Sequence, residues 1–187
     1  TIGFNRIGTD SLGNSAVPNV GGGINISNSS SGNFIASNLV SGNGFDGVHV
    51  FNSANTSIVD NYIGTNANGT VALPNGEDGI STNQAPNTII GGTDSSAGNL
   101  ISGNGRIGID IFNTPDSRIL GNYIGTNAAG SAAVPNASNG IFINNSSSNI
   151  IGGSVSGSRN LVSGNGDVGI HVVNNSKNNL IAGNYVG

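Results

Sequence analysis

The sequence contains no cysteine, methionine or tryptophan, and only 7% of its 187 residues are charged. Without cysteine, the chain can form no disulfide bond and no thiolate metal site. So few charges are atypical of intrinsic disorder, which needs a high net charge and few apolar residues, whereas the apolar share here is 35%. Because methionine is missing even at position 1, we expect this chain to be a segment of a longer protein.

Basic residues are scarce too, with five Lys and Arg against nine Asp and Glu. A net charge of −4 leaves no basic face for a phosphate backbone, so the composition predicts no nucleic-acid partner. No apolar run approaches the roughly 20 residues of a membrane-spanning helix, and we expect no membrane span in this chain. The glycines at 21–23 have no helical pattern after them and no lysine nearby, so they predict no phosphate-binding loop, and we expect no cofactor.

What the chain does contain is glycine, at 32 residues, with much asparagine and serine. These residues weaken helix interiors and favour turns, which predicts an all-β fold. Residues 61–66 read Asn-Tyr-Ile-Gly-Thr-Asn and recur at 122–127, with partial copies at 184–187 and 5–10. The Ile or Val of this segment stands at positions 7, 63, 124 and 186, so the copies lie 56, 61 and 62 residues apart.

Each of these periods divides into two turns of chain. A Gly-apolar-x-apolar strand begins at six positions: Gly23, Gly47, Gly79, Gly108, Gly140 and Gly169. Between these strands lie two further short apolar segments, separated by asparagine, while longer turns add loops such as 66–78 and its copy 127–139. Three short strands of period 2 per turn predict a parallel β-helix, a solenoid in which each coil rises about 4.8 Å.

Stacking the coils in this register predicts four inward columns of mostly β-branched residues, which pack well on a pleated surface. Two come from the Gly-apolar-x-apolar strands: Ile24, Val48, Ile80, Ile109, Ile141, Ile170; and Ile26, Val50, Thr82, Ile111, Ile143, Val172. The third is Ile35, Ile58, Ile89, Ile119, Ile150, Ile181, and the fourth is Ile7, Val40, Ile63, Ile101, Ile124, Val162, Val186.

Asparagine recurs at the corners of the coils in two further columns. The first is Asn5, Asn38, Asn61, Asn99, Asn122, Asn160 and Asn184. The second is Asp10, Asn43, Asn66, Asn104, Asn127 and Asn165. Asparagine tolerates the left-handed backbone of a sharp corner, and stacked amides hydrogen-bond from coil to coil. Because asparagine returns at every coil, we interpret these columns as structural ladders and not as ligand contacts.

The Gly-Ile-x-Ile strands, the asparagine corners and the Asn-Tyr-Ile-Gly-Thr-Asn copies resemble the right-handed parallel β-helix repeats of the pectate lyase-like superfamily. The resemblance covers nearly the whole chain and implies a right-handed solenoid of about six to seven coils with three short strands each. It says little about activity, because that superfamily includes polysaccharide lyases, hydrolases and epimerases as well as non-catalytic bacterial surface proteins and adhesins. Repetitive chains such as this one are most similar to the last group.

Enzymes of that superfamily use clusters of acidic and basic residues on the outer wall, and the sequence shows none. Its acidic residues are scattered: Asp10, Asp46, Asp60, Glu77, Asp78, Asp94, Asp110, Asp116 and Asp167. One outward column nevertheless places His49, Ser81 and Asp110 on successive coils, and these residue types match a hydrolase triad. Residue identity supplies neither hydrogen-bond contact nor an oxyanion hole, so we predict no catalytic residue there. We likewise predict no metal site, including one shared by His49 and His171.

A second outward column alternates leucine and tyrosine. It contains Arg6, Leu39, Tyr62, Leu100, Tyr123, Leu161 and Tyr185. An exposed apolar stripe of this length is abnormal for a monomer, so we expect the 66–78 type loops to cover it. The alternative is an interface for another protofilament, or for a glycan stacked on the tyrosine rings.

Taken together, residues 1–187 are expected to form one β-helix within a longer repeat array. The chain begins and ends in the same phase of the repeat without polar caps, so we expect end-to-end or side-by-side self-association. The hypothesis we favour is an extracellular or cell-surface structural or adhesive solenoid, with polysaccharide or cell-surface glycan as a further partner. The alternative is a carbohydrate-active enzyme or glycan-binding module.

Overall fold

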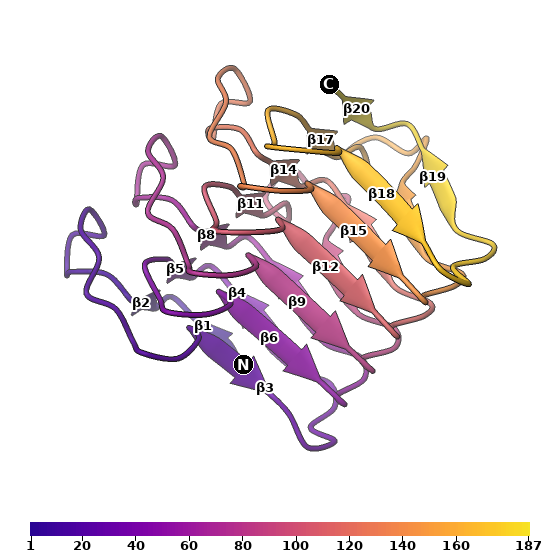
Figure 1. Ribbon diagram of the computed structural model, residues 1–187, viewed down its shortest axis with the longest axis horizontal. Coiled ribbons are helices and arrows are strands. Elements are labelled where there is room, and N and C mark those ends of the chain that lie inside the picture. Colours follow the sequence, from indigo (N-terminus) through magenta and orange to yellow (C-terminus); the bar gives the residue numbers. More distant parts are fainter.

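The computed structural model describes residues 1–187 as 20 short strands and no helix (Figure 1). All strands pair in parallel and form three sheets that run along the molecule, which confirms the predicted solenoid of three strands per coil. Two sheets hold seven strands and the third holds six, so the chain completes about seven coils. No helix is present that could cross a membrane.

The three sheets are visited in turn by each coil. Sheet 1 contains β1 (Ile2–Gly3), β4 (Phe34–Ala36), β7 (Ser57–Val59), β10 (Ile89–Gly91), β13 (Arg118–Leu120), β16 (Ile150–Gly152) and β19 (Leu180–Ala182). Sheet 2 contains β2 (Arg6–Ile7), β5 (Leu39–Val40), β8 (Tyr62–Ile63), β11 (Leu100–Ile101), β14 (Tyr123–Ile124), β17 (Leu161–Val162) and β20 (Tyr185–Val186). Sheet 3 contains β3 (Ile24–Ile26), β6 (Val48–Phe51), β9 (Ile80–Asn83), β12 (Ile109–Phe112), β15 (Ile141–Asn144) and β18 (Ile170–Val173).

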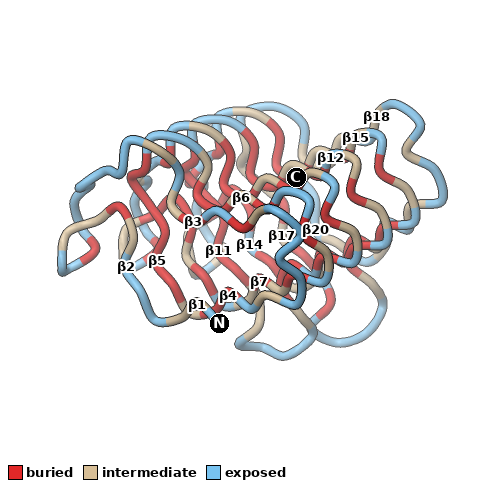
Figure 2. Tube along the Cα trace, turned by 90° about the horizontal axis from the view of Figure 1, so that it is seen from below, coloured by how far each residue is buried: buried red, intermediate tan, exposed pale blue.

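The core is a single cluster of aliphatic side chains contributed by the three sheets. In Figure 2 the buried residues recur from one coil to the next along the tube. The predicted columns of sheets 2 and 3 lie in register as expected, and their central members are fully buried. Burying one such side chain is worth about 1.5–3 kcal/mol, so these columns carry much of the stability.

The predicted column of sheet 1 is wrong at two positions. Ile58 and Ile119 pair with Ile90, and Ile119 pairs with Ile151, so the inward members are Ile90 and Ile151 and not their neighbours Ile89 and Ile150. Ile90 and Ile151 are fully buried, whereas Ile89 is 38% exposed. In each Ile-Ile pair a shift of one residue exchanges the two faces of the strand, and the apolar pattern alone does not choose between them.

The first asparagine ladder is complete and lies at the corner between sheets 1 and 2. Each side-chain amide donates to the Oδ1 of the next asparagine, from Asn5 to Asn184, at 2.9 or 3.0 Å. The backbone N–H of each member donates to the same oxygen. Asn61, Asn99, Asn122 and Asn160 are buried, and a buried amide of this kind is costly unless it is paired. The ladder therefore fixes the corner of every coil.

The second ladder differs from the predicted column. Asn43 donates to Asn75, Asn75 to Asn104, and Asn104 to Asn136, so Asn66 and Asn127 are not members. Asn19 and Asn165 extend the ladder at its two ends.

The displaced asparagines hold the inserted loops instead. The Oδ1 of Asn66 accepts hydrogen bonds from the backbone N–H groups of Thr70 and Val71, and Asp10 and Asn127 cap their loops in the same way. The loop inserted after Asn66 thus moves the ladder position to its far end at Asn75.

Glycine opens each strand of sheet 3 because the coils approach closely there. A Cβ atom on Gly47 would lie 2.7 Å from the carbonyl oxygen of Gly79 and 2.7 Å from the Ile63 side chain. Both contacts are shorter than van der Waals separation, so a larger residue would force the coils apart. The recurring glycine is therefore a packing requirement of the solenoid.

Candidate functional site

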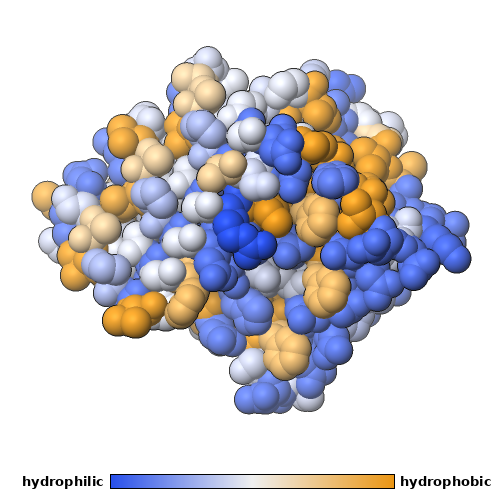
Figure 3. All heavy atoms as spheres, in the orientation of Figure 1, coloured by the Kyte–Doolittle hydropathy of each residue, from blue (hydrophilic) through white to orange (hydrophobic).

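The outer face of sheet 3 carries the column that matches a hydrolase triad by residue type. His49 pairs with Ser81 and Ser81 pairs with Asp110, so all three lie on successive strands as predicted. No hydrogen bond joins the three side chains. The Nδ1 of His49 is instead paired with the Oδ2 of Asp46, at 3.0 Å. The structure brings these residues into one column but does not assemble a triad from them. Hydrophobic side chains on this face occur in separate groups among hydrophilic ones (Figure 3).

At the corner that precedes sheet 3, carboxylates stand at the same position of consecutive coils. The Oδ1 of Asp46 accepts the backbone N–H of Asp78, and the Oδ1 of Asp78 accepts the backbone N–H of Ile107. Asp78 is 2% exposed, and its other oxygen lies 3.6 Å from the guanidinium of Arg106. Here aspartate takes the place that asparagine holds in the other ladders.

Asp110 lies on the next coil and completes a group that we call the carboxylate corner, formed by Asp46, Asp78 and Asp110. The Oδ1 of Asp110 is buried and has no hydrogen-bond partner. The pKa of Asp110 is raised to about 7, chiefly by burial and secondly by the neighbouring charge of Asp78. Burial also raises the pKa of Asp78 to about 6, against the opposing effects of the Ile107 N–H and of Arg106.

His49 lies beside the carboxylate corner and is coupled electrostatically to Asp46 and Asp78. The hydrogen bond that the His49 imidazole donates to the Asp46 carboxylate raises the pKa of His49, because it stabilises the protonated ring. Sequence inspection missed this cluster since its members lie 32 residues apart in the chain. The available signal was the position before each strand-opening glycine, which holds aspartate in two consecutive coils.

The structure contains no group of three or more His, Cys, Asp or Glu side chains placed to hold a metal ion. His49 lies on β6 and His171 on β18, four strands apart along sheet 3, so the two imidazoles do not meet.

The leucine and tyrosine column lies on the outside of sheet 2 in the predicted register. The long loops fold back over it, as expected. Gly69 of one loop lies against Leu100 and Tyr62, and Gly130 of its copy lies against Leu161 and Tyr123. Leu100 is consequently buried, whereas Tyr123 keeps 42% of its surface exposed.

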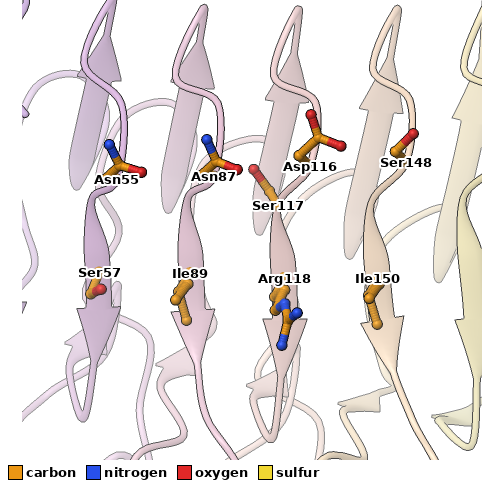
Figure 4. Close-up of a pocket in the computed structure, with 9 residues that line it drawn as sticks. All are labelled: Asn55, Ser57, Asn87, Ile89, Asp116, Ser117, Arg118, Ser148 and Ile150. Atoms are coloured by element: carbon orange, nitrogen blue, oxygen red, sulfur yellow. The ribbon is translucent and has the colours of Figure 1, made fainter. Parts of the chain in front are cut away.

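A groove of about 770 Å³ runs along the outside of sheet 1 and crosses four coils (Figure 4). We call it the sheet-1 groove. Its lining consists of Asn55, Ser57, Asn87, Ile89, Asp116, Ser117, Arg118, Ser148 and Ile150. All of them except Ser117 form two rows, one on the strands and one at the corner where the chain arrives from sheet 3 (Figure 4). None was singled out in the sequence as a site, and their alignment appears only once the coils are in register.

A family model described as a right-handed beta helix region matches residues 5–186. The match spans nearly the whole chain and agrees with the three parallel sheets. A search of curated proteins found no significant similarity to any of them.

Proposed function

Because the chain belongs to the right-handed β-helix family, we propose that it is a structural or adhesive part of an extracellular or cell-surface protein. In this role the solenoid is a stiff rod that displays its outer faces.

One observation supports this proposal above the others. The inner features return at every coil, with ladder bonds of 2.9–3.0 Å from the first to the last, while the outward column of sheet 3 changes residue type freely. A chain arranged for length and rigidity needs constant interior contacts and tolerates varied surfaces. Its low share of charged residues, 7%, suits contact with hydroxyl-rich material such as polysaccharide.

Localisation tests the proposal in the source cell. An antibody raised against this chain should label intact cells as strongly as lysed ones. Labelling that needs lysis would overturn the extracellular placement. The purified chain should also release no reducing ends and no unsaturated uronates from a panel of polysaccharides.

A carbohydrate-active enzyme is the second candidate, and the carboxylate corner favours it. Carboxyl groups whose pKa is raised to about 6 and about 7 are suited to general acid catalysis at neutral pH. If the same polysaccharide panel yields products, Asp110→Asn should abolish their release, because Asp78 is buried and cannot contact a substrate. Product release that survives Asp110→Asn would exclude this site as its source.

A further inference from the structure

We infer that a pocket on the outside of sheet 2 binds a guanidinium group from outside the chain, carried by a small compound or by an arginine side chain of a partner protein. This pocket lies on a different face from the carboxylate corner and from the sheet-1 groove. Its ligand does not depend on the extracellular function proposed above.

Three pockets follow one another along the edge where sheet 1 passes into sheet 2. They lie beside the row of long loops that follow β2, β8 and β14 (Figure 1). Each pocket contains one leucine and one tyrosine of the outward column, and we call them the first, middle and last pockets. Their leucines and tyrosines are, in that order, Leu39 and Tyr62, Leu100 and Tyr123, Leu161 and Tyr185. The three pockets are therefore successive copies of one structural feature.

An arginine of the chain itself lines each of the two outer pockets. In the last pocket, the Cζ of Arg159 lies 5.4 Å from the centre of the Tyr185 ring, and its Nη1 donates to the tyrosine hydroxyl at 2.9 Å. In the first pocket, Arg6 lines the same cavity as Tyr62 and Asp60. A guanidinium over a tyrosine ring is attracted by the negative face of the ring. The outer pockets thus show which chemical group this feature accepts.

The middle pocket is lined by no basic residue. Gly98 holds the position of Arg159 there, because each of the two residues directly precedes an asparagine of the first ladder. A Cβ atom on Gly98 would clash with the carbonyl oxygen of Gly121, so the close approach of the coils excludes a side chain at this position. The middle pocket therefore differs from its two copies in having no cation of its own.

The side chains that line the middle pocket are suited to a cation. It contains both Tyr62 and Tyr123, and neither hydroxyl makes a hydrogen bond within the protein, in contrast to that of Tyr185. Asp60 adds a carboxylate whose Oδ2 accepts a single hydrogen bond, from the Ser37 hydroxyl at 2.7 Å. A carboxylate has about four acceptor positions, so Asp60 can also accept from a ligand. Two aromatic rings and a carboxylate attract a guanidinium through stacking and charge-assisted hydrogen bonds.

The two tyrosine rings are positioned by the long loops before any ligand arrives. A Cβ atom on Gly69 would lie 3.0 Å from the Cε2 of Tyr62, and one on Gly130 would lie 2.8 Å from the Cε1 of Tyr123. The two glycines therefore pack directly against the rings and restrict their movement. Binding then requires little ordering of the site, which lowers its cost.

Size and charge restrict the ligand to a small cationic group. The middle pocket has a volume of about 180 Å³, below the roughly 300–1,000 Å³ of pockets that enclose drug-sized ligands. The net charge of −4 favours a positive ligand over a negative one. A guanidinium has a planar face for the tyrosine rings and a fork of donors for the carboxylate, whereas an ammonium group has neither.

The pocket can be tested by NMR titration of the purified chain labelled in its tyrosine rings. The chain has only three tyrosines, so each ring can be followed separately. The probes are methylguanidinium, an end-blocked glycine–serine peptide with one central arginine, and the same peptide with citrulline as the neutral control. We expect the two guanidinium probes to shift the signals of Tyr62 and Tyr123 but not of Tyr185, and the citrulline peptide to shift none. Tighter binding of the arginine peptide than of methylguanidinium assigns the ligand to a partner protein, and equal or weaker binding assigns it to a small compound.

Substitutions in the middle pocket should weaken this binding. We expect Tyr123→Leu to reduce the affinity roughly fivefold and Asp60→Asn to reduce it roughly threefold. Leucine occupies the same column in the two adjacent coils, so Tyr123→Leu suits the fold. The matched control is Tyr185→Leu, which removes the ring that Arg159 already contacts and should leave the affinity unchanged. Unchanged urea denaturation of the three variants excludes a loss of fold, and unchanged affinity in Tyr123→Leu overturns the proposal.

Arg159→Gln tests the same pocket chemistry by a gain of binding. It removes the cation from the last pocket, which also contains the carboxylate of Asp94. Titration of this variant with either guanidinium probe should then shift Tyr185 as well, and the absence of that shift overturns the equivalence of the pockets. If neither guanidinium probe shifts Tyr62 and Tyr123 in the unmodified chain, the middle pocket is not a binding site. Equal shifts with the citrulline peptide overturn the role of the positive charge.

Discussion

Two rows of polar side chains run along the same coils, and they differ in one respect. In the ladder between sheets 1 and 2, every asparagine amide is bonded to its neighbours at 2.9–3.0 Å. On the rim of the sheet-1 groove, Asn55, Asn87, Asp116 and Ser148 have no protein partner. Both rows recur with the coil, so periodicity alone does not distinguish a structural row from one available to ligands. The pairing of the polar atoms does.

The difference follows from burial. A buried amide without a partner costs about 1–3 kcal/mol, so the ladder positions tolerate little besides asparagine. Rim positions need only a residue that accepts a left-handed backbone, which asparagine, aspartate and serine all do in solvent. Chemical variety along this solenoid therefore concentrates on its outer rows.

The largest loss of stability is expected when the ladder between sheets 1 and 2 is interrupted. Asn122→Leu removes the acceptor of the Asn99 N–H and the donor to the Ile90 carbonyl, as well as the link to Asn160. We expect a loss of roughly 3–5 kcal/mol in the free energy of unfolding, measured by urea denaturation. Asn25→Leu, at an exposed outward position of β3, should cost less than about 0.5 kcal/mol. Equal shifts for the two variants would contradict the structural role of the ladder.

The wall between the core and the groove can be probed at adjacent residues. Ile90 is fully buried against the core, and Ile89 faces the groove with 38% of its surface exposed. Ile90→Ala should destabilise the protein by about 2–4 kcal/mol, because it leaves a cavity between Ile58 and Ile119. Ile89→Ala should cost less than about 1 kcal/mol. A larger loss of stability for Ile89→Ala than for Ile90→Ala would show that Ile89 faces the core, as the sequence predicted.

Most of the fold was predictable because its signals are local and repeated. The glycines, the β-branched columns and the Asn5–Asn184 ladder each return once per coil. The errors in the inward column of sheet 1 and in the second asparagine ladder share a physical cause. Each segment offers two residues of the same type for one position, and the repeat spacing does not decide which of them occupies it. Ile89 and Ile90 are one such pair. Asn66 and Asn75 are another, and the loop between them decides which asparagine joins the ladder.

The site was less predictable, since both candidate surfaces depend on insert lengths that set which residues become neighbours. Asp46 and Asp78 are 32 residues apart, yet one hydrogen bond connects them. The groove likewise combines positions from four coils. Its unpaired side chains resemble ladder members in sequence, and only their surroundings in the folded chain reveal that they are free.

The carboxylate corner should make the free energy of unfolding depend on pH, which the uncharged asparagine ladders do not. Asp78 and Asp110 have folded-state pKa values of about 6 and about 7, above the ordinary 3.8. For an acid with a raised folded-state pKa, the folded protein binds the proton more tightly than the unfolded chain, so stability falls as pH rises from about 4 to about 7. The raised pKa of His49 acts in the same direction, since its contribution is present below pH 6.5 and is lost above it.

We therefore expect unfolding at pH 5 to require roughly 2 kcal/mol more than at pH 8, measured by urea denaturation at constant ionic strength. Asp110→Asn should flatten this profile, because the amide does not titrate. Asp60→Asn, at an exposed carboxylate bonded to Ser37, serves as the control and should leave the profile unchanged. A profile that rises towards pH 8 would show that the corner carboxylates are stabilised in their charged form.

The smallest effect on stability is expected on the rim, where it sharpens the contrast with the ladder. Asp116 has a φ of 59° and no side-chain partner, and asparagine accepts that backbone equally well. Asp116→Asn should therefore change the free energy of unfolding by less than about 0.5 kcal/mol. A marked destabilisation, measured by urea denaturation, would show that the rim residues have a structural role as the ladder residues do.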